Sequence, residues 1–387
     1  MEGVKPVIYV KLKRALYGTL NASLLFWKDL TTELKGWGFT INPYDECVAN
    51  KTINGKQCTV LWHVDDLKIS HVDSGVVDSI LEKLNGRYGK DSPLVTTRGK
   101  VHEYLGMTLD YSNKGEVMVK MYDYEDEIVE GSHNDMIGHA TSPAADHLYE
   151  VNNQNPTLLD EEKAKYFHTT TAKLLFLSKR ARPDLHQGVG FLTTRVRSPD
   201  DDDWKKLGRV IKYLRLNKHL PLTLRADDAR VMKWWIDASF AVHPDMKSHM
   251  GGNGSLGKGS FYTTSNRQKL NTKSSTEAEL VGIDDLMPMI LWSRYFLQAQ
   301  GYKMGASKVY QDNQSTMLLA KNGCASSGKR TRHINIRYFL VKDRVKSGEI
   351  EVEYCPTNAM IADYLTKPLQ GIKFRWFRDQ VLNIATK

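Results

Sequence analysis

The stretch from Thr59 to Ser70, Thr-Val-Leu-Trp-His-Val-Asp-Asp-Leu-Lys-Ile-Ser, sets two adjacent carboxylates, Asp65 and Asp66, between two short apolar runs. The β-branched and aromatic residues of these runs favour strands, so the stretch predicts a hairpin with the acids at its tip. Two like charges at a tight turn repel each other, and a divalent cation removes that cost because Mg²⁺ prefers oxygen ligands. The pattern is typical of a metal site, while an isolated Asp-Asp pair is also ordinary turn chemistry.

The length, composition and net charge of the chain favour a soluble protein of several domains that binds nucleic acid. A chain of 387 residues is long enough for two or three domains. A net charge of +9 with 18 Tyr and 8 Trp supplies basic groups for phosphates and aromatic faces for stacking. The four cysteines lack Cys-x-x-Cys spacing, which indicates a reducing compartment. No apolar run is long enough to span a membrane, so we expect no membrane partner and an intracellular location, cytoplasmic or nuclear.

Three motifs in the first 115 residues carry a resemblance to a known family. They are Lys11-Leu-Lys-Arg-Ala-Leu-Tyr-Gly18, His63-Val-Asp-Asp66 and Tyr104-Leu-Gly-Met107, the last within an expected strand over Tyr104–Tyr111. In this order and at these distances they resemble the palm of a reverse transcriptase from the Pol polyprotein of copia-type long-terminal-repeat retrotransposons. The resemblance implies that Asp65 and Asp66 hold the metal ions of a polymerase centre acting on a template-primer.

A polymerase centre also needs a third carboxylate, which this family carries some tens of residues before the Leu-Tyr-Gly segment. The only acid among residues 1 to 28 is Glu2. We therefore expect residues 1–115 to be a partial palm without fingers, which has lost polymerase activity unless a preceding segment supplies the missing acid.

Residues 116–228 are expected to form a helical thumb and connection. Helices are predicted over Tyr166–Leu177, Asp184–Thr194 and Trp204–Leu216. The last carries Lys205, Arg209 and Lys212 largely opposite its apolar residues, a pattern that suits either a duplex backbone or a solvated helix face.

Residues 229–387 contain four acids in a recurring order of elements. Asp237 ends an apolar strand, and Ser274-Ser-Thr-Glu-Ala-Glu279 opens a long amphipathic helix. Asp312 follows a short strand, and Asp363 lies in a final helix. This order resembles an RNase H domain, which implies that Asp237, Glu279, Asp312 and Asp363 hold two Mg²⁺ or Mn²⁺ ions at the scissile phosphate of an RNA/DNA hybrid.

Two assignments in this region leave alternatives. Glu277 rivals Glu279, which we prefer because Glu-Leu followed by Gly282 better matches the pattern of RNase H helices. The basic segment containing Arg330, Arg332 and His333 matches the family and suits contact with the hybrid backbone, although a solvated helix entry explains it too. A separate group of possible metal ligands, His243, Asp245 and His249, has no recognised metal-ligand spacing, so we expect these residues to belong to an ordinary loop.

The sequence therefore predicts an α+β and α/β multidomain protein: a partial reverse-transcriptase palm (1–115), a helical thumb and connection (116–228), and an RNase H-like mixed sheet with flanking helices (229–387). The expected activity is metal-dependent hydrolysis of the RNA strand of RNA/DNA hybrids. The alternatives are a catalytically silent retroelement remnant that only binds nucleic acid, or a full reverse transcriptase whose start lies upstream of Met1.

Overall fold

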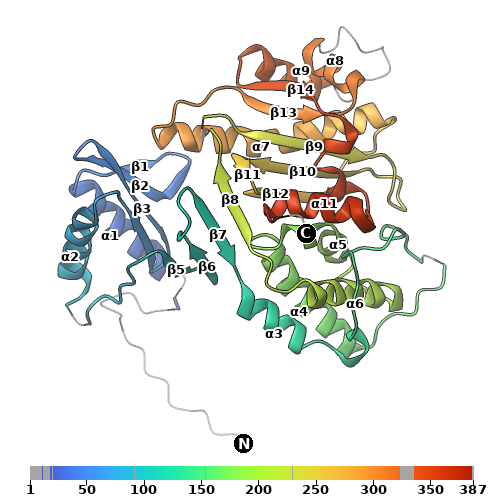
Figure 1. Ribbon diagram of the computed structural model, residues 1–387, viewed down its shortest axis with the longest axis horizontal. Helices are drawn as coiled ribbons and strands as arrows, with labels where there is room; N and C mark the ends of the chain where they lie inside the picture. Colours follow the sequence, from blue (N-terminus) through green and yellow to red (C-terminus); the bar gives the residue numbers. More distant parts are fainter. Residues whose placement is uncertain are drawn as a thin grey trace, which may run out of the picture. The chain divides into compact units, whose positions relative to one another are not determined.

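The structure is a computed structural model that describes residues 11, 18, 19, 21–90, 92–152, 154–228, 230–322 and 335–385. Its backbone separates into two compact units (Figure 1). The first comprises the residues up to Thr96 together with Ala299–Gly301, and the second comprises Thr97–Gln298 and the residues from Tyr302 onward.

The first unit is an antiparallel sheet of four strands that packs against two helices. Strands β1 (Thr40–Asn42), β2 (Asp45–Ile53), β3 (Lys56–His63) and β4 (Asp66–Ser70) are ordered as in the sequence, with helices α1 (Ala22–Gly36) and α2 (Ser74–Tyr88). The Asn-Gly pair between β2 and β3 has positive φ at both residues, as a two-residue hairpin turn requires. The sheet and both helices share one apolar core, which includes Leu30, Leu34, Val60, Trp62, Ile80 and Leu84.

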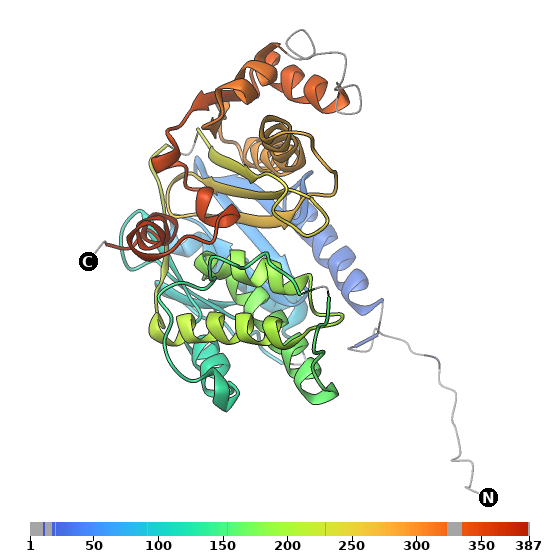
Figure 2. The ribbon, with the colours of Figure 1, turned by 90° about the vertical axis from the view of Figure 1, so that its right-hand side faces the viewer.

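The second unit contains the predicted mixed sheet, in the order β12-β10-β9-β13-β14. Strands β9 (Lys233–Ser239), β10 (His249–Ser255) and β12 (Tyr262–Arg267) form an antiparallel meander, while β13 (Ser307–Gln311) and β14 (Ile350–Tyr354) run parallel to β9. Figure 2 shows the long helix α7 (Ser275–Ala299) almost end-on against this sheet. Apolar residues of α7 and β9 pack together in one core, which includes Trp234, Ile236, Leu280, Ile283, Met287 and Ile290.

The remaining elements of the second unit are another five-stranded sheet and further helices. The sheet has the order β11-β8-β7-β6-β5, with β5 Val101–Tyr104, β6 Met107–Asp110, β7 Glu116–Lys120, β8 Leu222–Ala226 and β11 Gly257–Lys258. The helices are α3 Tyr122–Glu130, α4 Glu161–Ser178, α5 His186–Thr193, α6 Asp201–Leu216, α8 Gln314–Asn322, α9 Asn335–Lys346, α10 Asp363–Thr366 and α11 Gly371–Leu382. This mixed α+β architecture with several sheets confirms the predicted fold class. None of the helices described is long and apolar enough to cross a membrane.

One local prediction about this unit was wrong. The single strand expected over Tyr104–Tyr111 is the hairpin β5–β6, because Leu105 and Gly106 both adopt positive φ and turn the chain back. Alternation of apolar residues does not reveal this turn, because Leu is not a residue that favours positive φ. On α6, Lys206 is buried and donates to the carbonyl of Glu150, whereas Lys205 is exposed.

A buried ion cluster joins the helices of this unit. The guanidinium of Arg182, fully buried, bonds Glu125 at 3.0 Å through Nη1 and Asp184 at 2.8 Å through Nη2. Tyr213 on α6 donates to the same Asp184 carboxylate at 2.7 Å. Burial raises the pKa of Glu125, and the Arg182 charge opposes that rise. Each member of the cluster has at least one hydrogen-bonding partner within it, which offsets part of the cost of burying these groups.

Removing the central cation should strongly destabilise this unit. We expect Arg182→Met to lower the free energy of unfolding by about 3–5 kcal/mol, because Glu125 and Asp184 would remain buried without a counter-charge. Urea denaturation followed by circular dichroism measures the loss. Lys173→Met is the matched control: Lys173 pairs with Glu127 at 2.7 Å on the surface, so its loss should cost less than about 1 kcal/mol. Equal effects for the two variants would contradict this role of Arg182.

Candidate metal centre

Three acids from three elements meet at one edge of the mixed sheet. Strands β9 and β13 are parallel neighbours, with Val309 paired to Trp234, so their carboxyl ends lie at the same edge. Asp237 lies near the end of β9 and Asp312 directly follows β13, while Glu279 comes from the second turn of α7. One carboxylate oxygen of each acid lies within 4.8 Å of the others. We call these three residues the acid triad.

The start of α7 separates the roles of Glu277 and Glu279. The Glu277 carboxylate accepts from the backbone N–H of Lys273 at 2.7 Å, and the Glu277 N–H donates to Ser274 Oγ at 3.2 Å. These bonds cap the amino terminus of α7. Two residues later, roughly 200° around the axis, Glu279 accepts from Gln311 Nε2 at 3.2 Å and joins the triad. The geometry therefore favours Glu279, as preferred from the sequence.

The environment of the triad disfavours its negative charge. Asp237 and Glu279 are 1% and 5% exposed. Burial raises the pKa of Asp237, opposed by the Lys367 ammonium, and burial together with the Asp237 charge raises the pKa of Glu279 well above its usual value. Hydroxyl groups donate to two of the acids: Thr366 Oγ1 donates to Asp237, and Thr357 Oγ1 donates to Asp312 at 2.9 Å. Clustered, oriented carboxylates in such a place gain most from a bound cation.

The fourth predicted acid, Asp363, lies beside the triad but outside it. Its carboxylate is fully buried at the start of α10. One oxygen contacts Lys367 Nζ at 2.7 Å, and the other contacts Lys373 Nζ at 3.2 Å. Lys367 Nζ also lies 3.4 Å from Asp237 Oδ2. Sequence reasoning missed these ammonium groups, although Lys367 follows Asp363 at the i+4 spacing that pairs charges on a helix.

The donor set fits a hard divalent cation. The triad offers carboxylate oxygens alone, which suit Mg²⁺ or Mn²⁺, and its members contain none of the nitrogen or sulfur ligands that zinc sites favour. Asp237, Glu279 and Asp312 would hold the ion, and Asp363 would join them only if its ammonium partners moved.

The second acidic site, Asp65 and Asp66, lies at the predicted hairpin. Val64 and Asp65 form the turn, His63 pairs with Asp66, and both acids are exposed. Val64 has φ of 55°, a strained conformation for a β-branched residue. Within the described part of the chain, no third acid joins these two in a group able to hold a metal.

The basic residues predicted to contact nucleic acid differ in accessibility. Lys205 is exposed on α6, whereas Lys212 is half-buried. Arg209 turns inward and donates to Ser142 Oγ at 3.0 Å and Gln370 Oε1 at 3.1 Å. Arg330, Arg332 and His333 lie outside the described residues.

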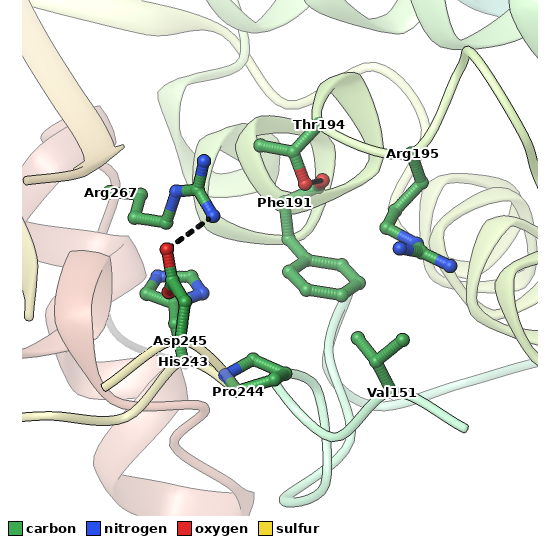
Figure 3. Close-up of a pocket in the computed structure, with 8 residues that line it drawn as sticks. All are labelled: Val151, Phe191, Thr194, Arg195, His243, Pro244, Asp245 and Arg267. Carbon is green, nitrogen blue, oxygen red and sulfur yellow. Dashed lines mark hydrogen bonds and ion pairs between the residues drawn. The ribbon is translucent and has the colours of Figure 1, made fainter. Parts of the chain in front are cut away.

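The loop after β9 borders a small pocket of about 220 Å³ (Figure 3). His243 Nε2 lies 3.0 Å from His249 Nδ1, and burial lowers the pKa of these imidazoles to about 4 and about 3. Asp245 instead pairs with Arg267 at 3.1 Å, as the dashed line in Figure 3 marks. The pocket is lined by Val151, Phe191, Thr194, Arg195, His243, Pro244, Asp245 and Arg267.

The chain is similar over almost its whole length to Pol polyproteins of retrotransposons. It is 26% identical over 377 residues to the retrovirus-related Pol polyprotein from transposon TNT 1-94 of Nicotiana tabacum, covering 96% of this chain and 28% of the relative. It is 25% identical to that from transposon RE2 of Arabidopsis thaliana, covering 97% and 25%. The putative transposon Ty5-1 protein YCL074W of Saccharomyces cerevisiae is 23% identical, covering 70% and 86%.

These similarities confirm the resemblance to copia-type Pol polyproteins, and they support a region related to reverse transcriptase and RNase H. The chain spans about a quarter of the length of the two plant relatives. No family model matches it. Among solved structures, a foamy viral protease-reverse transcriptase in complex with an RNA/DNA hybrid aligns with a TM-score of 0.46 and 14% identity, covering 89% of this chain and 39% of that chain.

The two glutamates of α7 should separate in a metal titration. We expect Glu279→Gln to weaken Mn²⁺ binding at least about tenfold, since even residues behind a metal ligand cost 10–100-fold when replaced. Glu277→Gln should leave Mn²⁺ affinity within about twofold and instead cost about 1 kcal/mol of stability through the helix cap. Isothermal titration calorimetry and thermal denaturation measure the two quantities. Weaker Mn²⁺ binding by the Glu277 variant alone would reverse the assignment.

The raised pKa of Glu279 also predicts a pH dependence in chelator-treated protein. Between the unfolded pKa and the higher folded pKa, the folded state binds more protons, so the stability contributed by Glu279 falls as pH rises. Glu279→Gln removes this loss. The variant should therefore be more stable than the parent at pH 8, and its advantage should shrink toward pH 5. Urea denaturation at both pH values tests the trend, and an advantage that grows on acidification would contradict it.

Proposed function

We propose that this chain hydrolyses the RNA strand of RNA/DNA hybrids with the help of divalent metal ions. The observation that carries the proposal is the acid triad, Asp237, Glu279 and Asp312, at the carboxyl edge of two parallel strands in a mixed sheet. Similarity to Pol polyproteins along almost the whole chain supports the same class of chemistry. We further propose that residues 229–387 form the nuclease, that residues 116–228 form the thumb and connection, and that residues 1–115 form a partial palm.

In this mechanism the protein holds and orients the acids. Gln311 donates to one oxygen of Glu279, Thr366 to one oxygen of Asp237 and Thr357 to one oxygen of Asp312, and these bonds help to orient the three carboxylates. Bound there, two Mg²⁺ ions would activate a water molecule and stabilise the departing 3′ oxygen of the RNA. Asp363 is proposed as the fourth ligand.

The proposed substrate is an RNA/DNA hybrid because the chain combines an acidic metal site with a net charge of +9. Hybrid phosphates would meet basic side chains outside the site and release counterions. Lys205, on the exposed side of α6, and Lys212 suit this role better than Arg209, whose guanidinium is engaged inside the fold. Arg330, Arg332 and His333 stay predictions for the same contact.

The hairpin acids Asp65 and Asp66 are proposed as two ligands of a polymerase centre. Two exposed carboxylates are too few to hold the two ions that nucleotidyl transfer uses. We therefore propose nuclease activity, and not polymerisation, for the described residues. Polymerisation would require a further carboxylate beside the hairpin.

The decisive experiment is cleavage of a labelled RNA/DNA hybrid by the purified chain in Mg²⁺ and in Mn²⁺. We expect cuts in the RNA strand of the hybrid and none in single-stranded RNA or duplex DNA. Asp312→Asn should lower the rate about 10²–10³-fold, the scale of losing one essential electrostatic group.

The matched control is Asp245→Asn, which removes an acid of the same second unit that pairs with Arg267 rather than joining the triad. It should retain nearly full cleavage. A folded parent chain that binds the hybrid without cutting it would overturn the nuclease proposal and favour a remnant that only binds nucleic acid.

A further inference from the structure

A lysine occupies the place where the fourth acid would reach the triad. The Lys367 ammonium lies 2.7 Å from Asp363 Oδ1 and 3.4 Å from Asp237 Oδ2. Both carboxylates are buried, whereas the Lys367 side chain is 40% exposed. The cation thus reaches inward from the surface and bridges two acids that are withdrawn from solvent.

This bridge and a metal ion compete for the same oxygen atoms. Both oxygens of Asp363 contact ammonium groups, one from Lys367 and one from Lys373. The oxygen of Asp237 that faces Lys367 also accepts from Thr366. A divalent ion placed between Asp237 and Asp363 would therefore lie against the Lys367 charge, and this like-charge repulsion disfavours simultaneous occupancy.

We propose that Lys367 is an internal counter-ion, which neutralises Asp237 and Asp363 when metal is absent and must leave before a second divalent ion can bind between them. The inference rests on the proposed function, because it assumes that the acid triad binds metal. An ion held by Asp237, Glu279 and Asp312 needs no displacement of Lys367, whereas an ion that also uses Asp363 does. The two ions therefore bind with unequal affinity, and Lys367 sets the difference.

The position of Lys367 suits a group that leaves. It lies just after α10, one residue before Pro368, with extended backbone. A lysine carries a point charge on a flexible side chain. Its ammonium can therefore move to solvent without breaking a bidentate interaction of the kind that arginine makes. Partial exposure of the side chain leaves that path open. The fully buried Arg182 offers no such path.

The test is a Mn²⁺ titration of the full chain, freed of metal by a chelator, without nucleic acid. Electron paramagnetic resonance reports free Mn²⁺, and the parent should show a stronger and a weaker site. Lys367→Met should tighten the weaker site about fivefold, the upper end of what a partly exposed ion pair contributes. The stronger site should stay within about twofold. Lys173→Met, which removes a surface ammonium paired at the same 2.7 Å distance, should leave both sites unchanged.

Thermal denaturation gives a second readout that is independent of activity. Without metal, Lys367→Met should lower the melting temperature, because Asp237 loses the Lys367 ammonium and Asp363 keeps only that of Lys373. Saturating Mn²⁺ should raise the melting temperature of this variant more than that of the parent. Lys367→Gln, which keeps a hydrogen-bond donor but no charge, should reproduce both effects and serves if the methionine variant does not fold.

The outcomes separate this inference from the nuclease proposal. Unchanged Mn²⁺ affinities and unchanged melting behaviour in both Lys367 variants would overturn the counter-ion role, while hybrid cleavage by the parent would leave the nuclease proposal standing. A parent chain that binds no Mn²⁺ at all, and behaves like Asp312→Asn, would overturn both.

Discussion

The mutual repulsion of buried carboxylates is the constraint on which the second unit depends. Asp237 and Glu279 are nearly inaccessible, and each makes the charge of the other more costly. Such a group persists only if other parts of the fold hold it together, and here the packing of α7 on β9 and β13 does so through an apolar core. Holding these acids close together therefore lowers the stability of the fold, as is common at ion-binding sites.

The two sets of buried carboxylates in this unit have cations that differ in their exposure to solvent. Arg182 satisfies Glu125 and Asp184 permanently, since all three side chains are buried and bonded to one another. Asp237 and Asp363 share a cation that retains access to solvent. A buried pair mainly fixes the arrangement of helices, whereas a partly exposed pair can exchange its cation. Exposure of the cation, more than bond length, distinguishes the two cases.

The sequence predicted the elements near the site better than the contacts within it. Short apolar runs and helical period identified β9, β13 and α7, because these elements bury continuous apolar faces. The resemblance of their order to an RNase H domain implied that Asp237, Glu279 and Asp312 share a metal site, and the structure brings one oxygen of each within 4.8 Å of the others. The engagement of Asp363 by Lys373 and the inward turn of Arg209 depend on residues far along the chain, which local patterns do not report. The β5–β6 turn was missed because Leu105 adopts a conformation that its side chain does not favour.

The two acidic sites show why residue type alone does not determine metal chemistry. Asp65 and Asp66 are exposed, so water already solvates their charges and an ion gains little by replacing it. Two acids of the triad, Asp237 and Glu279, are buried and Asp312 is half-buried, and Gln311 and hydroxyl donors bond to the three carboxylates. If the triad binds metal as proposed, a carboxylate there would gain more from a bound ion than one at the hairpin. The backbone of Val64 in the hairpin is strained, and packing or a partner must stabilise this conformation. A third acid and exclusion of water would be needed to give Asp65 and Asp66 the chemistry that burial already favours at Asp237.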